Sequence, residues 1–321
     1  MARWMVTGGA GYIGAHVARR LLESGREVVV VDDLSTGFRS FVPEEATFVE
    51  ASVADLTAGD LDGVDGVVHV AALKYAGVSV DEPLRFYRNN VEGTRALLET
   101  MVGAGCGRMV YSSSCSVYGT PRDDHVVEST PIGPESPYGE TKLIGEWLTA
   151  AAGVAHGLEH TSLRYFNVVG SGYDELFDAS PYNLFPLVFR AIDAGARPRV
   201  YGVDYPTPDG SCVRDYIHVG DLADAHVLAA ECLEAGRDLA PAYNVGTGTG
   251  ASVLEVMASV GRVLGVDLDP EIVERRPGDP ARIIADGSLA TADLGWTARH
   301  DLDDMVASAW RAWRASDRPA G

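Results

Sequence analysis

The chain contains 321 residues, 46% of them hydrophobic and 22% charged, so it is long enough for a full core and has the composition of a globular protein. Its formal net charge at pH 7 is −20. This excess of acid argues against nucleic acid and against anionic membranes as partners, because both bind through basic patches.

The cysteines and the apolar segments argue against a metalloprotein and against a membrane-spanning protein. Four cysteines, at positions 106, 115, 212 and 232, form no Cys-x-x-Cys pair, so we expect no metal site. No apolar run reaches the length of a membrane span. The first residues, MARWMVTGGAGYIG, suggest a strand and a turn rather than a basic and apolar leader. We therefore expect a reduced, cytoplasmic protein.

The first half of the chain alternates valine-rich segments with helical patterns. Strands are predicted at RWMVTG (3–8), EVVVVDD (27–33), VDGVVHVAAL (64–73) and GRMVYSSS (107–114). Helices are predicted over residues 11–24 and, roughly, 84–101. Near-continuous valine strands between helices are typical of a parallel sheet that is covered on both faces. The sequence therefore predicts an α/β protein with a Rossmann-type doubly wound parallel sheet.

A smaller second lobe is predicted where this alternation weakens. Pro, Gly and Asp accumulate in SGYDELFDASPYN (171–183) and YGVDYPTPDGSC (201–212). We expect the Rossmann-type domain over residues 1–169 and a smaller C-terminal α/β lobe, which would bind the substrate, over residues 170–321. Segments within 213–248 could return to the first domain.

A glycine-rich segment, TGGAGYIG, follows the first predicted strand and precedes a predicted helix. Gly8, Gly11 and Gly14 would let the backbone approach a pyrophosphate, which the amides at the start of the helix would bind. Asp32 closes the next predicted strand, where a ribose-binding carboxylate is expected. An anion there would repel a 2′-phosphate, so NAD is favoured over NADP. The alternative is a packing turn without a ligand.

Tyr138 and Lys142 lie four residues apart, after Ser136-Pro137, a plausible helix start. At this spacing both side chains share one face of a helix. A phenol has a pKa of about 10, so a base near neutral pH needs that pKa lowered, and we expect the Lys142 ammonium and a positive nicotinamide ring to lower it. Ser114 ends a predicted strand and could share the substrate proton with Tyr138. The alternative is a solvated lysine beside a core tyrosine.

With these sites identified, the chain resembles the extended short-chain dehydrogenase/reductase family, and within it the branch that interconverts UDP-glucose and UDP-galactose. The resemblance extends from Trp4 to about Asp286. The motifs that carry it are GGAGYIGAH (8–16), AALK (71–74), NNVEGT (89–94), SSSCSVYG (112–119), SPYGETK (136–142), RYFN (164–167), DYPTPDGSCVRDYIHV (204–219) and RRPGDPA (275–281).

The resemblance implies roles for the matching positions. The catalytic residues would be Tyr138 as base, Lys142 as its partner and Ser114 as a hydroxyl relay. The NAD-binding residues would be Gly8, Gly11, Tyr12, Ile13, Gly14, Asp32, Ser52, Val53, Ala71, Lys74, Asn89 or Asn90, Tyr138, Lys142 and Tyr165. The substrate-binding residues would be Lys74, Ser114, Tyr138, Asn167, Asn183, Tyr201, Arg214, Arg276 and Asp279.

The implied reaction is an NAD-dependent 4-epimerisation of a nucleotide-sugar. Tyr138 would take the proton of the sugar 4-hydroxyl while hydride passes from C4 to NAD, and the 4-keto sugar would accept the hydride on its other face. Two arginines would grip the diphosphate firmly, while the hexose would be held loosely enough to turn over. The resemblance also implies a homodimer formed through a helix pair that includes the Tyr138 helix.

Other nucleotide-sugars and other reactions remain open at this stage. UDP-N-acetylhexosamines, UDP-hexuronates and TDP-hexoses are alternative substrates, and Ile283, where some members have a bulky tyrosine, could leave room for an N-acetyl group. A dehydratase would need an Asp-Glu pair where this chain has Cys115 and Ser116, so dehydration is disfavoured. A reductase that releases its cofactor, or a non-catalytic NAD-binding regulator, is a further alternative.

Overall fold

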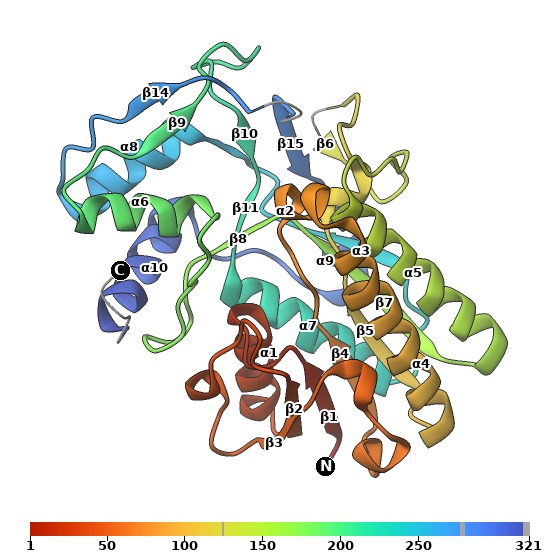
Figure 1. Cartoon of the computed structure of the whole chain (residues 1–321). Helices are drawn as coiled ribbons and strands as arrows, with labels where there is room; N and C mark the ends of the chain where they lie inside the picture. The colour runs from red at the N-terminus through yellow and green to blue at the C-terminus, as the bar shows by residue number, and fades with distance from the viewer. Residues whose placement is uncertain (124, 277–279, 317–321) are drawn as a thin grey trace.

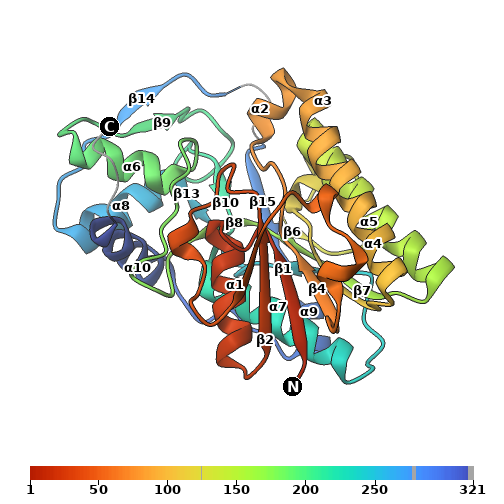
Figure 2. The same cartoon turned by 60° about the horizontal axis from the view of Figure 1, so that its bottom comes forward.

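A seven-stranded parallel sheet forms the centre of the computed structural model, which describes residues 1–123, 125–276 and 280–316 (Figures 1 and 2). The strand order is β12-β7-β5-β4-β1-β2-β3. The bounds are β1 Arg3–Thr7, β2 Glu27–Asp32, β3 Thr47–Glu50, β4 Gly66–His69, β5 Arg108–Ser112, β7 Glu159–Tyr165 and β12 Ala242–Val245. The order reverses between β1 and β4, and ligands of such sheets bind at the carboxyl ends beside that point. The predicted doubly wound α/β fold is confirmed.

Both faces of this sheet are buried, as the valine-rich strands predict. In β1, Trp4 and Val6 pack in one apolar cluster with Leu21 of α1, whereas Met5 packs in a second cluster with Leu97 of α4. The helices on the first face are α1 Tyr12–Glu23, α7 Val219–Glu234 and α9 Ser288–Leu294, and those on the second are α4 Gly93–Ala104 and α5 Pro137–His156. The predicted helix over residues 11–24 is thus confirmed as α1.

The helix predicted over residues 84–101 contains an irregular turn. It consists of α3 (Pro83–Phe86), a π-helical segment (Tyr87–Glu92) and α4. Such wide turns occur mostly as single insertions in α-helices, often at functional sites. Here the turn leaves Asn90 buried and Asn89 exposed.

The second group of elements is smaller and packs around its own core. Its helices are α6 Leu184–Asp193, α8 Val253–Leu264 and α10 Leu302–Ala315. A four-stranded sheet is ordered β13 Ala251–Ser252, β10 Val213–Arg214, β15 Arg282–Ala285 and β6 His125–Val126, and two parallel pairs join β8 Asn167–Val169 to β11 Tyr216–His218 and β9 Arg199–Tyr201 to β14 Glu271–Val273. Phe185, Phe189, Met257 and Trp313 fill the core between the helices.

The segment 213–248 contributes to both groups. It begins with β10 and β11 and then supplies α7 and β12, which cover and extend the central sheet. The division of the chain at residue 169 stays a prediction.

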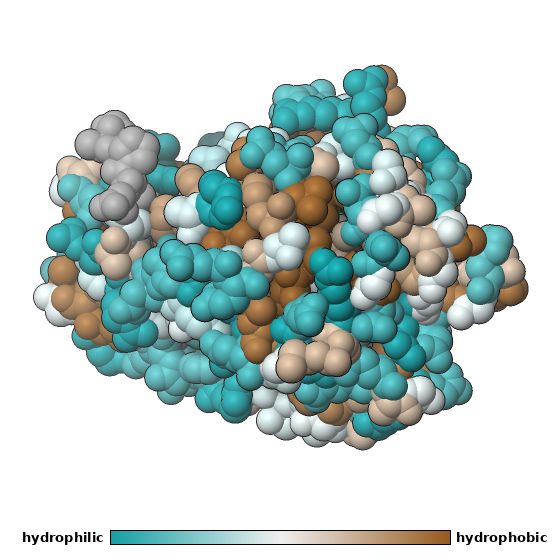
Figure 3. All heavy atoms as spheres, turned by 90° about the horizontal axis from the view of Figure 1, so that it is seen from below, coloured by the Kyte–Doolittle hydropathy of each residue, from teal (hydrophilic) through white to brown (hydrophobic). Residues whose placement is uncertain are grey.

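The surface seen from below is mostly hydrophilic, with apolar residues gathered in a strip near its middle (Figure 3). Within the described residues, no helix combines the length and the apolar character that crossing a membrane requires. The same part of the chain contains no cluster of three His, Cys, Asp or Glu side chains that could hold a metal ion.

Candidate active site

The turn between β1 and α1 is packed so closely that two of its positions require glycine. Gly8 has a φ of +70°, and its N–H donates to the Val31 carbonyl oxygen at 2.7 Å. A Cβ on Gly8 would lie 2.7 Å from the nitrogen of Ala71, and a Cβ on Gly14 would lie 2.1 Å from the carbonyl oxygen of Gly8. Gly14 therefore lets the first turn of α1 rest directly on the end of β1, and Gly8 lets the loop after β4 approach the same turn.

The N-terminus of α1 is left without a side-chain cap. Gly11 occupies the cap position, and no side chain accepts a hydrogen bond from the first turn there. The first helical residues, Tyr12 and Ile13, line a cavity of about 680 Å³. Uncapped N–H groups at the positive end of a helix dipole bind phosphate groups well. This turn therefore fits the pyrophosphate of NAD.

Asp32, at the end of β2, is oriented by the same turn. Its Oδ2 accepts the Ala10 N–H at 3.0 Å, and its Oδ1 accepts the Leu34 N–H at 2.9 Å. Burial raises the pKa of this carboxyl, and the two backbone hydrogen bonds work against that rise. Each oxygen keeps a second lone pair, so the carboxylate can still accept hydrogen bonds from ribose hydroxyls.

Ser52 and Val53 follow β3, next to the Asp32 strand end. The Ala51 N–H donates to the Asp32 carbonyl oxygen at 3.2 Å, and the Ser52 hydroxyl accepts the N–H of Ala54 at 3.3 Å. These contacts fix a partly exposed turn at the edge where an adenine would lie.

Tyr138 lies in the first turn of α5 and forms part of the cavity wall. Its backbone N–H donates to the Ser79 hydroxyl at 3.0 Å, which fixes the helix start against α2 (Ala76–Asp81). Ser114, after β5, lines the same cavity and hydrogen-bonds the phenol, and this contact lowers the pKa of Tyr138. The Ser114 hydroxyl accepts the Ser116 N–H at 3.2 Å, so its position is fixed as well.

The expected lowering of the Tyr138 pKa is not produced by the protein alone. Burial raises the pKa of Tyr138 to about 12 and outweighs the hydrogen bond from Ser114. Desolvation penalises the phenolate more than the side chains around it stabilise it, and the lowering expected from Lys142 and the nicotinamide ring together stays a prediction.

Lys142 lies one turn further along α5, beneath Tyr138 rather than on the cavity wall. Its Nζ donates to the Ser112 carbonyl oxygen at 2.7 Å and lies 5.3 Å from the centre of the Tyr111 ring. Burial lowers the pKa of Lys142 to about 7, and the Glu146 carboxylate works against that fall. The ammonium therefore exists near neutral pH only with support from its neighbours.

Glu146, which sequence reasoning missed, provides a buried negative charge one turn beyond Lys142. It accepts two hydrogen bonds from the Arg164 guanidinium, at 2.9 and 2.6 Å, and one from the Ser113 hydroxyl at 2.5 Å. The two side chains are only 11% and 7% exposed, so the pair is shielded from solvent. The i, i+4 spacing from Lys142 was the available sequence signal.

The loop after β4 is fastened to the π-helical segment. The Asn90 side chain accepts the Leu73 N–H at 2.8 Å and donates to the Leu73 carbonyl oxygen and to the Thr141 hydroxyl, both at 3.0 Å. Of the two asparagines considered from the sequence, Asn90 is thus the buried one that positions the loop carrying Ala71 and Lys74. Asn89 is exposed.

The cavity brings most of the predicted substrate residues together. The predicted residues that line it are Tyr12, Ile13, Lys74, Ser114, Tyr138, Tyr165, Asn167, Asn183, Tyr201, Arg214 and Arg276. Predicted residues outside this lining are Gly8, Gly11, Gly14, Asp32, Ser52, Val53, Ala71, Asn89, Asn90 and Lys142. Asp279 lies outside the described residues.

Several of the side chains that line the cavity are arginines. Arg197, Arg199, Arg214 and Arg276 all line it. The Arg276 guanidinium lies over the Tyr201 ring at 4.0 Å, and the hydrogen bond from Arg276 lowers the pKa of this phenol. Arg214 donates to the Pro280 carbonyl oxygen at 2.7 Å, which orients its guanidinium. Such a group of arginines suits a diphosphate.

The asparagines expected at the nucleotide-sugar are held by the second group of elements. Asn167, at the start of β8, donates to the Asp215 carbonyl oxygen at 3.2 Å. Asn183, at the N-terminus of α6, donates to the Asp178 carboxylate at 2.7 Å. Ile283 packs in a buried cluster with Val117 instead of lining the cavity.

Fold and site together define a Rossmann-type, nucleotide-dependent enzyme whose tyrosine, serine and lysine lie beside one cavity. The family model for the NAD dependent epimerase/dehydratase family matches residues 4–246. A UDP-glucose 4-epimerase from Streptomyces lividans is 44% identical, over 98% of this chain and 96% of that one. The chain belongs to the NAD-dependent epimerase/dehydratase family, and the resemblance seen in the sequence is confirmed.

Solved structures are equally similar. A UDP-glucose-4-epimerase from Stenotrophomonas maltophila, with bound NAD and formylated UDP-arabinopyranose, has a TM-score of 0.93 and 40% identity, with 98% of each chain covered. A UDP-glucose 4-epimerase from Brucella ovis in complex with NAD has a TM-score of 0.91 and 40% identity, covering 96% of this chain and 97% of that one. The likeness therefore includes both groups of elements, not the sheet alone.

Proposed function

We propose that the protein interconverts UDP-glucose and UDP-galactose by an NAD-dependent 4-epimerisation. The observation that carries the proposal is one cavity lined by two chemically different sets of side chains. One set includes Ser114 and Tyr138, and the other consists of arginines, among them Arg214 and Arg276. A proton-transfer site and a diphosphate site on one cavity suit a nucleotide-sugar whose hexose reacts.

Each group on the wall has a task in this reaction. The Tyr138 hydroxyl oxygen would accept the proton of the sugar 4-hydroxyl and later return it, with Ser114 sharing that hydrogen bond. NAD, when bound, would supply the hydride acceptor and a positive charge. Because the pKa of Tyr138 is about 12 in the protein without a bound cofactor, proton removal would depend on that added positive charge acting together with the Lys142 ammonium.

The binding residues would hold the two ends of the substrate unequally. Arg214 and Arg276 would pair with the diphosphate, and Tyr201 would lie near the uracil. Polar side chains that already have partners, such as Asn183, would meet the hexose through single hydrogen bonds. Firm binding of the nucleotide with loose binding of the hexose would let the oxidised sugar turn over.

Dehydration is the less favoured reaction of the family. Cys115 stands on the cavity wall where a dehydratase would need an acid, and burial raises the pKa of its thiol to about 12. A neutral thiol of this kind is a poor proton donor near pH 7. Other UDP-hexoses, UDP-N-acetylhexosamines, UDP-hexuronates and TDP-hexoses remain candidate substrates.

The test is to purify the protein, release and identify its bound nucleotide, and assay a panel of UDP- and TDP-sugars. The proposal expects NAD and the equilibration of UDP-glucose with UDP-galactose from either side. NADH released in proportion to sugar consumed would instead indicate a dehydrogenase, and loss of water from the sugar would indicate a dehydratase.

A homodimer through α4 and α5 belongs to the same proposal. Apolar side chains are exposed on and beside α5: Trp147 is 61% exposed, Val154 92% and Leu84 of α3 79%. Trp147 and Val154 are seven residues apart and so share one face of α5, away from Lys142. Light scattering should give a dimer mass for the wild type and a monomer mass for Trp147→Glu. A monomeric wild type would contradict the dimer. A cytoplasmic location stays a prediction.

A further inference from the structure

Two loops from the two groups of elements meet beside the cavity. The loop after β4 carries Lys74 and Tyr75, and the loop before α6 carries Asp178 and Tyr182. The Lys74 Nζ lies 3.9 Å from the Asp178 Oδ1, and the rings of Tyr75 and Tyr182 pack edge to face with centroids 4.7 Å apart. The Lys74 Nζ also lies 5.6 Å from the Tyr75 ring centre. These four residues are called the cleft bridge.

The cleft bridge forms part of the wall of the cavity that contains Tyr138. Lys74, Asp178 and Tyr182 line this cavity. The Lys74 side chain is nevertheless 39% exposed and Tyr182 is 54% exposed. These two side chains therefore reach both the solvent and the cavity. The bridge thus joins the two loops at a solvent-exposed part of the cavity wall.

Both halves of the bridge rest on fixed supports. The Asp178 carboxylate accepts hydrogen bonds from the Asn183 amide at 2.7 Å and from the Ser180 N–H at 3.0 Å. Arg190 of α6 holds the same loop through the carbonyl oxygens of Ser180 and Ala179. On the other side, Asn90 clamps the residue before Lys74.

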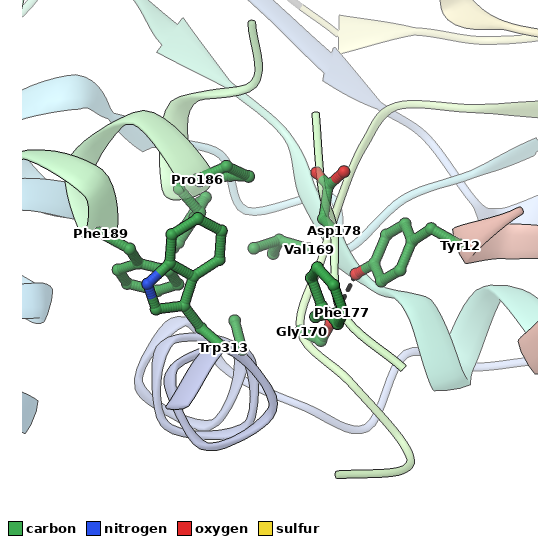
Figure 4. Close-up of a pocket in the computed structure, with 10 residues that line it drawn as sticks. Tyr12, Val169, Gly170, Phe177, Asp178, Pro186, Phe189 and Trp313 are labelled. Carbon is green, nitrogen blue, oxygen red and sulfur yellow. Dashed lines mark hydrogen bonds between the residues drawn. The ribbon is translucent and has the colours of Figure 1, made fainter. Parts of the chain in front are cut away.

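The inner neighbours of Asp178 place this end of the cavity beside the α1 turn. Asp178, Tyr12 and Gly170 also line a small void of about 10 Å³ next to the cavity, where the Tyr12 hydroxyl donates to the Gly170 carbonyl oxygen at 2.5 Å (Figure 4). Burial raises the pKa of Tyr12, and the nearby Asp178 carboxylate adds to that rise. The bridge thus closes the cavity near the start of α1, where the cofactor turn begins.

We propose that the cleft bridge retains the oxidised sugar in the cavity during turnover. It thereby determines how often the 4-keto sugar escapes and leaves the enzyme inactive. The proposal rests on the proposed function. When hydride has left C4 and the 4-hydroxyl proton has passed to Tyr138, the sugar is a ketone and the cofactor is reduced. A ketone that escapes at this point leaves a reduced, inactive enzyme, whereas a retained ketone takes the hydride back.

A loosely held hexose makes such a barrier necessary. The oxidised sugar must turn over in the cavity, so contacts that fix the hexose tightly would prevent the reaction. Retention then depends on closure between the two loops, which restricts escape without gripping the sugar. Tyr75 and Tyr182 do this through contact with each other, so the closure survives rotation of the sugar.

The test uses the holoenzyme and follows the ratio of completed epimerisations to released 4-keto sugar. Reduced cofactor is read from its absorbance, and free ketone is measured in an ultrafiltrate. Tyr182→Ala should lower the ratio by about 3- to 10-fold, the range that loss of one aromatic pair produces in an equilibrium. Tyr75→Ala should do the same, and the double variant should equal either single one, because both changes remove one contact.

Two variants separate closure from general damage. Tyr182→Phe keeps the ring and should keep the wild-type ratio. Asp178→Asn keeps one acceptor oxygen, for either the Asn183 amide or the Ser180 N–H, and loses the charge facing Lys74, so it should lower the ratio as well. A wild-type ratio in Tyr182→Ala, with NAD content and melting temperature unchanged, overturns the proposal.

Failure of the proposed function gives a different result. If the wild type epimerises no UDP-hexose, the reaction assignment is wrong, and the bridge is then tested by the rate at which UDP-glucose leaves the holoenzyme. A faster release from Tyr182→Ala than from Tyr182→Phe supports the bridge, and equal rates contradict it.

Discussion

The Lys142 Nζ donates a hydrogen bond of 2.7 Å to the carbonyl oxygen of Ser112, the last residue of β5. This contact ties the buried ammonium to the end of the strand that leads to Ser114, so one strand end positions both the Lys142 ammonium and the hydroxyl that hydrogen-bonds Tyr138. A guanidinium is larger and planar, so it would fit this buried position, where Lys142 is 2% exposed, less well than an ammonium.

Replacing the phenol hydroxyl of Tyr138 should remove proton transfer and little else. In Tyr138→Phe, kcat should fall by about 100- to 10,000-fold, the usual effect of losing a general base. The phenyl ring keeps the packing, so NAD content and melting temperature should stay close to the wild type. Steady-state kinetics and the nucleotide content of the purified variant check this. Activity near the wild-type value would contradict the role given to Tyr138.

Lys142 should also determine part of the pH dependence of stability in the cofactor-stripped protein. Burial lowers the pKa of Lys142 to about 7, against about 10.5 in the unfolded chain. Between these values the unfolded state binds more protons than the folded one, so the free energy of unfolding rises with pH. The difference in unfolding free energy between the wild type and Lys142→Met should therefore shift in favour of the wild type from pH 7 to pH 9.

Denaturant titrations of both proteins at several pH values measure that difference. Comparing the two proteins cancels the other titrating groups, including the buried tyrosines and thiols. A difference that does not change with pH would contradict a depressed Lys142 pKa.

Buried histidines should make the fold sensitive to mild acid. Burial lowers the pKa of His69 and of His16 to about 3, and that of His226 to about 4. Below pH 6.5 these histidines bind protons in the unfolded state but stay neutral in the folded state. The free energy of unfolding therefore falls as the pH drops from 6.5 towards 4. In His226→Gln, which keeps a partner for the Ser112 hydroxyl, this loss between pH 7 and pH 5 should be smaller. Thermal melts at the two pH values test it, and an equal loss in both proteins would argue against His226.

The sheet and the α1 turn could be predicted because their signals are local. Near-continuous valine runs, a Gly-x-x-Gly-x-x-Gly turn and Asp32 at a strand end each indicate their structure within a few residues of sequence. The Tyr138–Lys142 spacing likewise indicated a shared helix face. Such local patterns can be recognised in the sequence because they depend on neighbouring residues and not on what the segment packs against.

What the sequence did not predict depends on distant contacts. No pattern in the sequence near Glu146 predicts its ion pair with Arg164, which lies eighteen residues further along the chain. The choice between Asn89 and Asn90 depended on a π-helical turn that no periodicity indicates. The raised pKa of Tyr138 likewise follows from burial, which only the folded structure fixes.

Glu146 should control the charge of Lys142. Its carboxylate raises the pKa of the ammonium against the effect of burial, and Arg164 holds it in place through two hydrogen bonds. Glu146→Gln keeps the shape and removes the negative charge, so the Lys142 pKa should fall further. The ammonium would then be lost at lower pH, and the kcat–pH profile should decline at a lower pH than in the wild type.

A matched control separates this charge effect from structural damage. Glu140 lies on the same helix, on a partly exposed surface, and hydrogen-bonds Tyr87 instead of facing Lys142. Glu140→Gln should keep the wild-type pH profile even if stability changes. Because a purely structural role for Glu146 would lower kcat equally at every pH, an unshifted profile in Glu146→Gln would show that this carboxylate supports the fold and not the charge of Lys142.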